Sequence, residues 1–186
     1  MEFLKDLRLR LHYKGLLKEV AKRKPAVGRG AVTWKNAKQI GVLFNADEPA
    51  ARKQILKYAD ALRKKGKQVR ILGFLTEAQE GQEFAFRTFS KKDIDWQFRP
   101  KGEEVQAFMQ QSFDLMFHLG LQPDFQLEYI AALSNAKLRI GPPTEHTYAY
   151  DLMIDVPASA GLQGFIAQME SLLGKTNTPY EPANAS

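Results

Sequence analysis

The sequence has no cysteine and only three histidines in 186 residues. Without cysteine the chain can form no disulfide, no thiolate nucleophile and no cysteine-ligated metal site, a composition typical of proteins in a reducing compartment. The histidines, His12, His118 and His146, are far apart in the sequence and lack the i, i+4 spacing with which a helix holds zinc. We therefore expect no metal site and no other cofactor.

Long apolar runs are also missing. No stretch approaches the roughly 20 apolar residues that cross a bilayer as a helix. The first residues, MEFLKDLRLRLHYKG, carry a charge every two or three positions and so lack the apolar core of a signal peptide. We expect a cytoplasmic protein, and 186 residues with 44% hydrophobic content predict one sizeable core rather than two full domains.

The motifs of common nucleotide-binding and hydrolytic enzymes are absent as well. No GxGxxG or GxxxxGK[ST] sequence follows a predicted strand, so the backbone loop that usually binds a dinucleotide or a triphosphate is missing. There is also no GxSxG motif, in which a nucleophilic serine sits on a strand-to-helix turn. These absences favour a non-catalytic protein over an enzyme.

The beginning of the chain has an excess of positive charge. Residues 1–39 contain eleven Lys or Arg and three acidic residues, a net charge of +8, whereas the other 147 residues carry 16 basic and 18 acidic side chains, a net charge of −2. From Phe3 to about Lys24 apolar residues recur at helical intervals, which predicts a helix with a break or kink at Gly15. Residues 25–38 have the Pro and Gly content of a linker.

The rest of the chain alternates between strand and helix patterns. Continuous apolar runs predict buried strands at 39–45 and 68–75. The helix between them begins near Asp47 and Pro49 and ends at Gly66, which completes a βαβ unit with parallel strands. Further strands are predicted by FDLMFHL, AKLRIGP and YDLMIDV. Further helices are predicted after Gly102, around Val105, Phe108 and Met109, then at 124–134 and at 162–173, the last capped by Gly174.

This pattern predicts the fold class α/β, a three-layer sandwich built on a mostly parallel, Rossmann-like sheet. We expect three parts: a basic helical extension and linker at 1–38, the α/β domain at 39–174, and a flexible tail at 175–186.

The segment 76–100 is less regular. Ile94, Trp96 and Phe98 alternate with polar residues, which predicts a strand with one buried face, and Phe84 and Phe86 suggest a similar short strand. The mixture of aromatic and basic residues resembles that of platforms that bind single-stranded nucleic acid. Aromatic residues on one face of a strand also commonly fill a core, so both interpretations stay open.

A ligand pocket is a second hypothesis. FDLMFHL and YDLMIDV align His118 with Asp155, which places a polar group near the carboxyl end of each predicted strand. Asn45 and Asp47 follow the first strand, and ligands of open α/β sheets bind outside the carboxyl ends of the strands. The same residues have structural interpretations: His118 as a buried structural histidine and Asp47 as a helix N-cap.

Two further aspartates belong to the same repeated pattern. Asp114 and Asp151 stand at the starts of these two strands. We expect both side chains to face solvent at the opposite rim of the sheet. The loop GPPTEHTYAYD could bring Glu145 and His146 to the carboxyl edge, or could be a surface connection stiffened by its two prolines.

Residues 113–142, FDLMFHLGLQPDFQLEYIAALSNAKLRIGP, resemble part of the acceptor-binding domain of heptosyltransferase-like glycosyltransferases. In that family an Asp-Leu strand, an Ala-Leu-rich helix and an Arg-Ile-Gly strand follow one another. The resemblance implies that Asp47 is the counterpart of the catalytic aspartate. However, NADEP replaces the family's Gly-Asp context and the nucleotide-sugar domain is missing, which argues against glycosyl transfer.

Over nearly its whole length the chain resembles a family of small uncharacterised Bacteroidota proteins that is known only as a domain of unknown function. The resemblance implies the α/β fold and a cytoplasmic location, and it implies no activity.

The basic N-terminal helix leads to the main functional hypothesis, because a polybasic helix suits a phosphate-rich surface. We expect a non-catalytic module that binds RNA or a ribonucleoprotein, with the ribosome as the first partner to consider. The expected contacts are Arg8, Arg10, Lys14, Lys18, Lys22, Arg23 and Lys24. Three alternatives stay open. The helix could pack on the domain, it could bind an anionic membrane or a protein partner, or the sheet edge could hold a small ligand or an active site.

Overall fold

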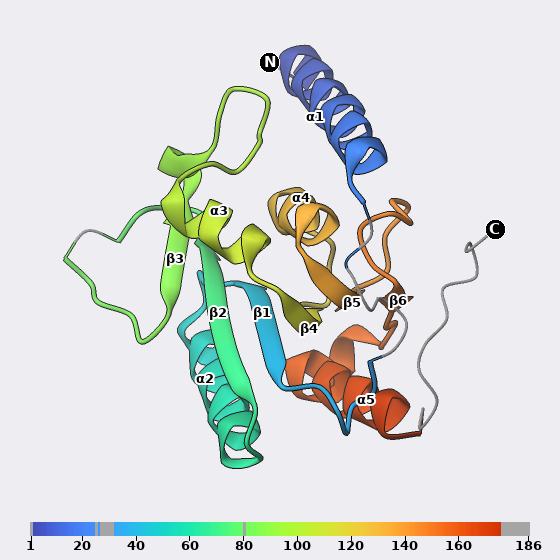
Figure 1. Ribbon diagram of the computed structural model, residues 1–186. Coiled ribbons are helices and arrows are strands. Elements are labelled where there is room, and N and C mark those ends of the chain that lie inside the picture. Colours follow the sequence, from blue (N-terminus) through green and yellow to red (C-terminus); the bar gives the residue numbers. More distant parts are fainter. Residues whose placement is uncertain (1, 25, 27–31, 80, 176–186) are drawn as a thin grey trace.

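The computed structural model describes residues 2–24, 26, 32–79 and 81–175 (Figure 1). The strands are β1 (Gln39–Asn45), β2 (Gln68–Leu75), β3 (Arg87–Ser90), β4 (Phe113–His118), β5 (Ala136–Gly141) and β6 (Leu152–Met153). The helices are α1 (Glu2–Lys22), α2 (Pro49–Lys64), α3 (Glu103–Gln110), α4 (Phe125–Leu133) and α5 (Gly161–Lys175), with short 3₁₀ helices η1 (Lys91–Asp93) and η2 (Ala158–Ala160).

The six strands form one open sheet in the order β3-β2-β1-β4-β5-β6, and every neighbouring pair is parallel. Helices α2 and α5 cover one face of the sheet, and α3 and α4 cover the other (Figure 1). The order reverses direction between β1 and β4, which is the place where ligands commonly bind in open α/β sheets. The predicted three-layer Rossmann-like sandwich is confirmed.

Strand β1 shows why the two faces need apolar side chains. Ile40, Val42 and Phe44 are buried in the core cluster that includes residues of α2 and α5, whereas Leu43 is buried in the cluster on the other side of the sheet. Burying each of these side chains stabilises the fold by about 1.5–3 kcal/mol. The strand is therefore apolar from Ile40 to Phe44, as the sequence predicts.

Helix α1 is one continuous helix of 21 residues that runs through Gly15, so the predicted break is wrong. A single glycine costs a helix about 1 kcal/mol, and contacts between α1 and the domain on both sides of Gly15 offset this cost. Part of the predicted linker falls on residues 25 and 27–31, and nearly all of the predicted tail falls on 176–186. Both of these stretches lie outside the described residues.

The predicted strand at 94–98 is wrong. Residues 91–93 form η1, and the following loop returns on itself through an isolated antiparallel bridge between Ile94 and Pro100. Trp96 is 61% exposed rather than buried. Phe84 and Phe86 also lie outside any strand, since β3 begins at Arg87.

The side chains of Asp114 and Asp151 both bond to other residues of the domain, so the prediction that they face solvent is wrong. Asp114 accepts hydrogen bonds from the backbone N–H groups of Lys38 and Gln39 and pairs with Lys137 Nζ at 2.8 Å. Burial raises the pKa of Asp114, but these bonds outweigh it and lower the pKa overall. The Asp151 carboxylate, only 4% exposed, pairs with Arg139 at 2.9 Å.

The last two elements differ in length from their predictions. The predicted strand YDLMIDV is reduced to the two residues of β6, and α5 continues past Gly174 to Lys175 instead of ending at a glycine cap. Within the described part of the chain, none of the helices is both long enough and apolar enough to cross a membrane.

Candidate functional site

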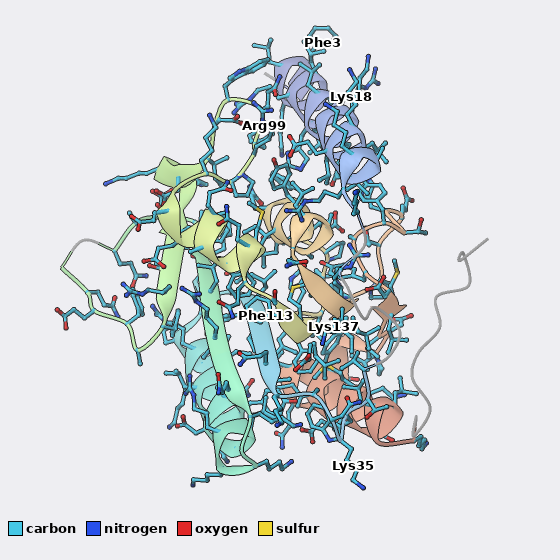
Figure 2. All side chains as sticks on the ribbon, in the orientation of Figure 1. Phe3, Lys18, Lys35, Arg99, Phe113 and Lys137 are labelled. Atoms are coloured by element: carbon cyan, nitrogen blue, oxygen red, sulfur yellow. The ribbon has the colours of Figure 1, made fainter. Side chains whose placement is uncertain are left out.

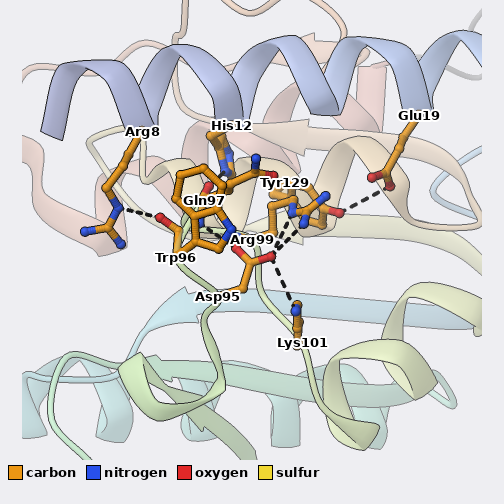
Figure 3. A network of polar contacts seen from close by, with 9 residues as sticks. All are labelled: Arg8, His12, Glu19, Asp95, Trp96, Gln97, Arg99, Lys101 and Tyr129. Carbon is orange, nitrogen blue, oxygen red and sulfur yellow. Dashed lines mark hydrogen bonds and ion pairs between the residues drawn. The ribbon is translucent and has the colours of Figure 1, made fainter. Parts of the chain in front are cut away.

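Helix α1 docks on the domain through one face, which is partly polar. His12 and Leu16 are fully buried there. His12 Nδ1 donates to the backbone oxygen of Gln97 at 3.1 Å, and the Tyr129 hydroxyl of α4 donates to Glu19 at 3.2 Å (Figure 3). Burial lowers the pKa of His12, which favours the neutral ring in the docked helix.

The opposite face of α1 carries a row of exposed cations, which we call the basic row: Arg10, Lys14, Lys18 and Lys22. These residues follow one another at intervals of four, so each lies about 6 Å further along the helix axis than the last. Figure 2 shows Lys18 on this solvent-facing side. Arg23 and Lys24 extend the exposed positive charge beyond the end of the helix.

Arg8, which the sequence groups with these cations, lies in a different environment. Its Nε donates to the backbone oxygen of Trp96 (Figure 3). Its guanidinium stacks over the Phe98 ring at 3.9 Å from the ring centroid. Arg8 is half-buried and helps to attach α1 to the 94–100 loop. It therefore contributes to docking as well as to the positive charge of the helix.

Large apolar side chains are exposed in the same part of the molecule. They include Phe3 (77% exposed), Leu4 (62%), Leu7 (43%), Leu17 (50%) and Trp96 (61%). The first four belong to α1, and Trp96 belongs to the loop that Arg8 contacts. Exposed apolar side chains that gather in one region of a protein commonly mark an interaction surface.

The second candidate region is the carboxyl edge of the sheet. His118 shows most clearly that polar side chains there bond to other residues of the fold. The ring is only 2% exposed, and its Nδ1 hydrogen-bonds with the Tyr150 hydroxyl. Burial lowers the pKa of His118 to about 3, so the ring is neutral at physiological pH. Its position fits the structural interpretation.

Asp47 holds the ends of β1 and β2 together instead of capping α2. Its carboxylate accepts hydrogen bonds from the backbone N–H and the hydroxyl of Thr76. The N-cap of α2 is Glu48, which makes no capping hydrogen bond with its side chain. The predicted role of Asp47 as a helix N-cap is therefore wrong.

Asn45 and Asp124 meet at the place where the strand order reverses. Asn45 is the last residue of β1, interacts with the Asp124 side chain and accepts from the Asp47 backbone N–H at 3.0 Å. Asp124 caps α4 by accepting from two backbone N–H groups, and burial raises the pKa of its carboxyl group. Asp155, the remaining predicted pocket residue, is exposed in the segment after β6.

Three helices, α2, α3 and α4, carry acidic residues at or just before their N-termini. Asp47 and Glu48 precede α2, Glu103 and Glu104 begin α3, and Asp124 caps α4. A helix N-terminus binds phosphate through free N–H groups and a positive dipole end, and a carboxylate there competes for both. The negative charge of these residues makes the edge less favourable for a nucleotide phosphate.

A small cavity of about 160 Å³ opens at the carboxyl end of β2 and β3. Its lining includes Leu75, Phe84 and Asp93 but none of the four predicted pocket residues. Its volume is below the 300–1,000 Å³ that is usual for ligand pockets. Among the described residues, no three His, Asp or Glu side chains lie close enough together to hold a metal ion.

Sequence reasoning missed a buried polar cluster beneath α1. The Glu128 side chain of α4 is 2% exposed, and its Oε2 lies 3.2 Å from His146 Nδ1 and 3.5 Å from the Tyr13 hydroxyl. The Tyr13 and His146 rings stack at 3.9 Å. Glu128 Oε1 and the Tyr148 hydroxyl are buried without a hydrogen-bond partner among the described residues. The one signal in the sequence is a glutamate inside the apolar helix FQLEYIAAL.

Comparison with known proteins shows a family but supplies no activity. Among curated proteins, no sequence matches the chain. One family model matches residues 8–175, which include most of α1 as well as the whole sheet. The chain therefore belongs to this family, the family of unknown function DUF6913.

Proposed function

We propose that this protein is a non-catalytic, cytoplasmic module that binds RNA or a ribonucleoprotein, with the ribosome as the first partner to test, through the exposed face of α1. The observation that carries this proposal is that the two faces of α1 differ in their contacts. One face docks on the domain through His12 and Leu16, and the basic row lies exposed on the other. Docking holds the cations on a rigid support, where they can contact phosphates together.

Binding of this kind depends strongly on salt, because each phosphate contact releases a condensed counterion. Four contacts predict an affinity loss of roughly 50- to 150-fold when the salt concentration rises from about 50 to 200 mM. The negative charge of the sheet edge favours an orientation in which the basic row faces the RNA and the edge faces away.

Co-sedimentation with ribosomes on a sucrose gradient tests the proposal. The double variant Lys14→Glu/Lys18→Glu reverses two exposed cations, and Lys53→Glu/Lys57→Glu reverses two exposed cations at the same spacing on α2. We expect the first variant to stay at the top of the gradient and the control to sediment with ribosomes at low salt. Equal behaviour of the two variants would contradict binding through α1.

A membrane surface is a second candidate, and the exposure of Phe3, Leu4 and Leu7 favours it. The position of the cations argues against it. At 100° per residue, Lys14 and Lys18 fall in the same sector of α1 as Phe3 and Leu7, and the four positions span about 60°. A helix lying in the bilayer surface would therefore push the ammonium groups as deep as the apolar side chains. Sedimentation with anionic vesicles that is lost in Leu7→Asp would support the membrane instead.

The finer family relationships are also proposals. The resemblance of residues 113–142 to heptosyltransferase-like enzymes and the resemblance of the whole chain to Bacteroidota proteins support a common origin of the fold. They do not support glycosyl transfer, since Asp47, the counterpart of the catalytic aspartate, is bound to Thr76. A small-ligand or enzymatic role for Asn45, Asp47, His118 and Asp155 would require a ligand that reaches this edge, and a screen by thermal shift tests for one.

A further inference from the structure

We propose that Trp96 is a base-stacking residue and that the RNA bound by α1 is single-stranded next to it. This inference rests on the proposed function of α1 and adds the class of RNA. Trp96 is 61% exposed although it belongs to a loop whose other parts are tightly held. An exposed indole on a rigid support offers a flat surface to an unpaired base.

The loop that carries Trp96 is fixed by Asp95. Its carboxylate, 6% exposed, accepts hydrogen bonds from the backbone N–H groups of Gln97 and Arg99, both at 2.9 Å. The same carboxylate pairs with the Arg99 guanidinium at 2.8 Å and with Lys101 Nζ at 3.4 Å (Figure 3). These bonds lower the pKa of Asp95, although desolvation alone would raise it. The backbone on both sides of Trp96 is thus held in one conformation before any ligand binds.

Helix α1 holds the same loop from the other side. Arg8 donates to the backbone oxygen of Trp96, and His12 donates to that of the next residue, Gln97. Trp96 therefore lies directly beside the first half of α1, and an RNA strand that contacts both must pass from the basic row around the helix to this loop. The guanidinium of Arg8 adds a positive charge at this junction.

The other aromatic residues of this segment are engaged in the fold. Phe89 is 3% exposed, Phe98 lies under Arg8, and Phe84 and Phe86 pack against the core. Trp96 is the exposed aromatic residue of the segment, so the nucleic-acid platform suggested by the sequence is reduced to this one side chain. In a duplex the base faces are stacked on one another, and only unpaired bases can stack on a tryptophan.

Fluorescence of Trp96 tests this directly, because the chain has only two tryptophans. Trp34 is half-buried and packs near Lys67 and Phe117, so Trp34→Phe leaves Trp96 as the only reporter. We would titrate this variant of the full chain with a single-stranded oligouridine and with an RNA duplex of the same length. We expect quenching by the single strand and little quenching by the duplex.

Substitution measures the contribution of the stack. Trp96→Ala should weaken binding of the oligouridine about five- to 150-fold, the range for losing one stacked base. Trp96→Tyr should restore most of the affinity, and Lys53→Glu/Lys57→Glu, which changes exposed residues of α2, should change it little. Circular dichroism checks that each variant folds.

The outcomes separate this inference from the proposed function. Salt-dependent RNA binding that is lost in Lys14→Glu/Lys18→Glu but unchanged in Trp96→Ala, without quenching, would overturn the stacking role and leave the proposed function standing. Equal binding and quenching with the duplex would overturn the single-strand assignment. Failure to bind any RNA, or a blue shift of Trp96 emission with anionic vesicles alone, would overturn both.

Discussion

The exposed face of α1 and the carboxyl edge of the sheet both contain polar residues that stand out in the sequence, but the fold uses them in opposite ways. At the edge, Asp47 binds Thr76 and His118 binds Tyr150. On α1, the basic row is exposed on the side of the helix away from its docking contacts. Polar groups that are bound inside a fold contribute mainly to its stability, and exposed cations in a row are available to a partner.

This difference predicts how substitutions in the two regions should act. Substitutions of inward-bound polar residues should lower the free energy of unfolding, and substitutions in the basic row should change binding while leaving stability almost unaltered.

The largest effect on stability is expected for the buried ion pair of Arg139 and Asp151, whose side chains are 9% and 4% exposed. Asp151→Ala should lower the free energy of unfolding by about 3–5 kcal/mol, because it leaves a buried guanidinium without its counter-charge. Urea denaturation measures this value. In the matched control Asp60→Ala, which breaks the exposed pair with Arg63, the change should be below about 1 kcal/mol.

His118 should make the protein less stable in mild acid. In the folded protein, burial lowers the pKa of His118 to about 3. In the unfolded chain the same ring takes up a proton near pH 6.5. Stability is therefore complete above pH 6.5 and falls by about 1.4 kcal/mol per pH unit below it, down to the folded pKa.

The matched variant for this pH effect is His118→Phe. Between pH 7 and pH 5 it should lose about 2 kcal/mol less stability than the unsubstituted chain, since it has no ring nitrogen to protonate at position 118. Other histidines, such as His12, stay in both proteins, so the difference isolates His118. Identical pH profiles for the two proteins would contradict the buried, neutral state of this ring.

A smaller loss is expected for Asp47→Ala. The two hydrogen bonds to Thr76 together contribute about 1–2 kcal/mol to stability. Asp155→Ala, at an exposed position, should change stability by less than about 0.5 kcal/mol. If Asp155→Ala proved as destabilising as Asp47→Ala, the edge would contain a structural contact that this account omits.

The smallest effect on stability is expected on α1. Lys14→Glu/Lys18→Glu should change the free energy of unfolding by no more than about 0.5 kcal/mol per residue, because both side chains are exposed. Thermal unfolding at moderate salt measures it. A loss of several kcal/mol would show that the basic row supports the docking of α1 rather than a partner.

The sequence predicted the regular elements well, for physical reasons. Strands β1 and β2 begin and end at the predicted residues, since a strand buried on both faces must be continuously apolar and is followed by turn or helix-start residues. The irregular 94–100 loop was predicted wrongly. Its conformation depends on the hydrogen bonds of one side chain, Asp95, and alternation of apolar residues carries no information about such bonds.

The candidate site was predictable in composition but not in geometry. The surplus of cations on α1 is visible in the sequence, whereas the face that docks is decided by distant residues such as Gln97 and Tyr129. Arg8 and Lys14 look equivalent in the sequence, yet one stacks on Phe98 and the other is exposed. The buried carboxylate of Glu128 likewise depends on contacts with Tyr13 and His146, which are remote in sequence.

The most direct test of the central claim is the salt dependence of binding to a ribosomal RNA fragment, measured by fluorescence anisotropy. We expect Lys14→Glu/Lys18→Glu to bind the RNA more weakly. The slope of log affinity against log salt should also be smaller in magnitude by about 1.4–1.8, the value for two lost phosphate contacts. Lys53→Glu/Lys57→Glu should keep the slope of the unsubstituted chain. Equal slopes for the two variants would contradict RNA binding through the basic row of α1.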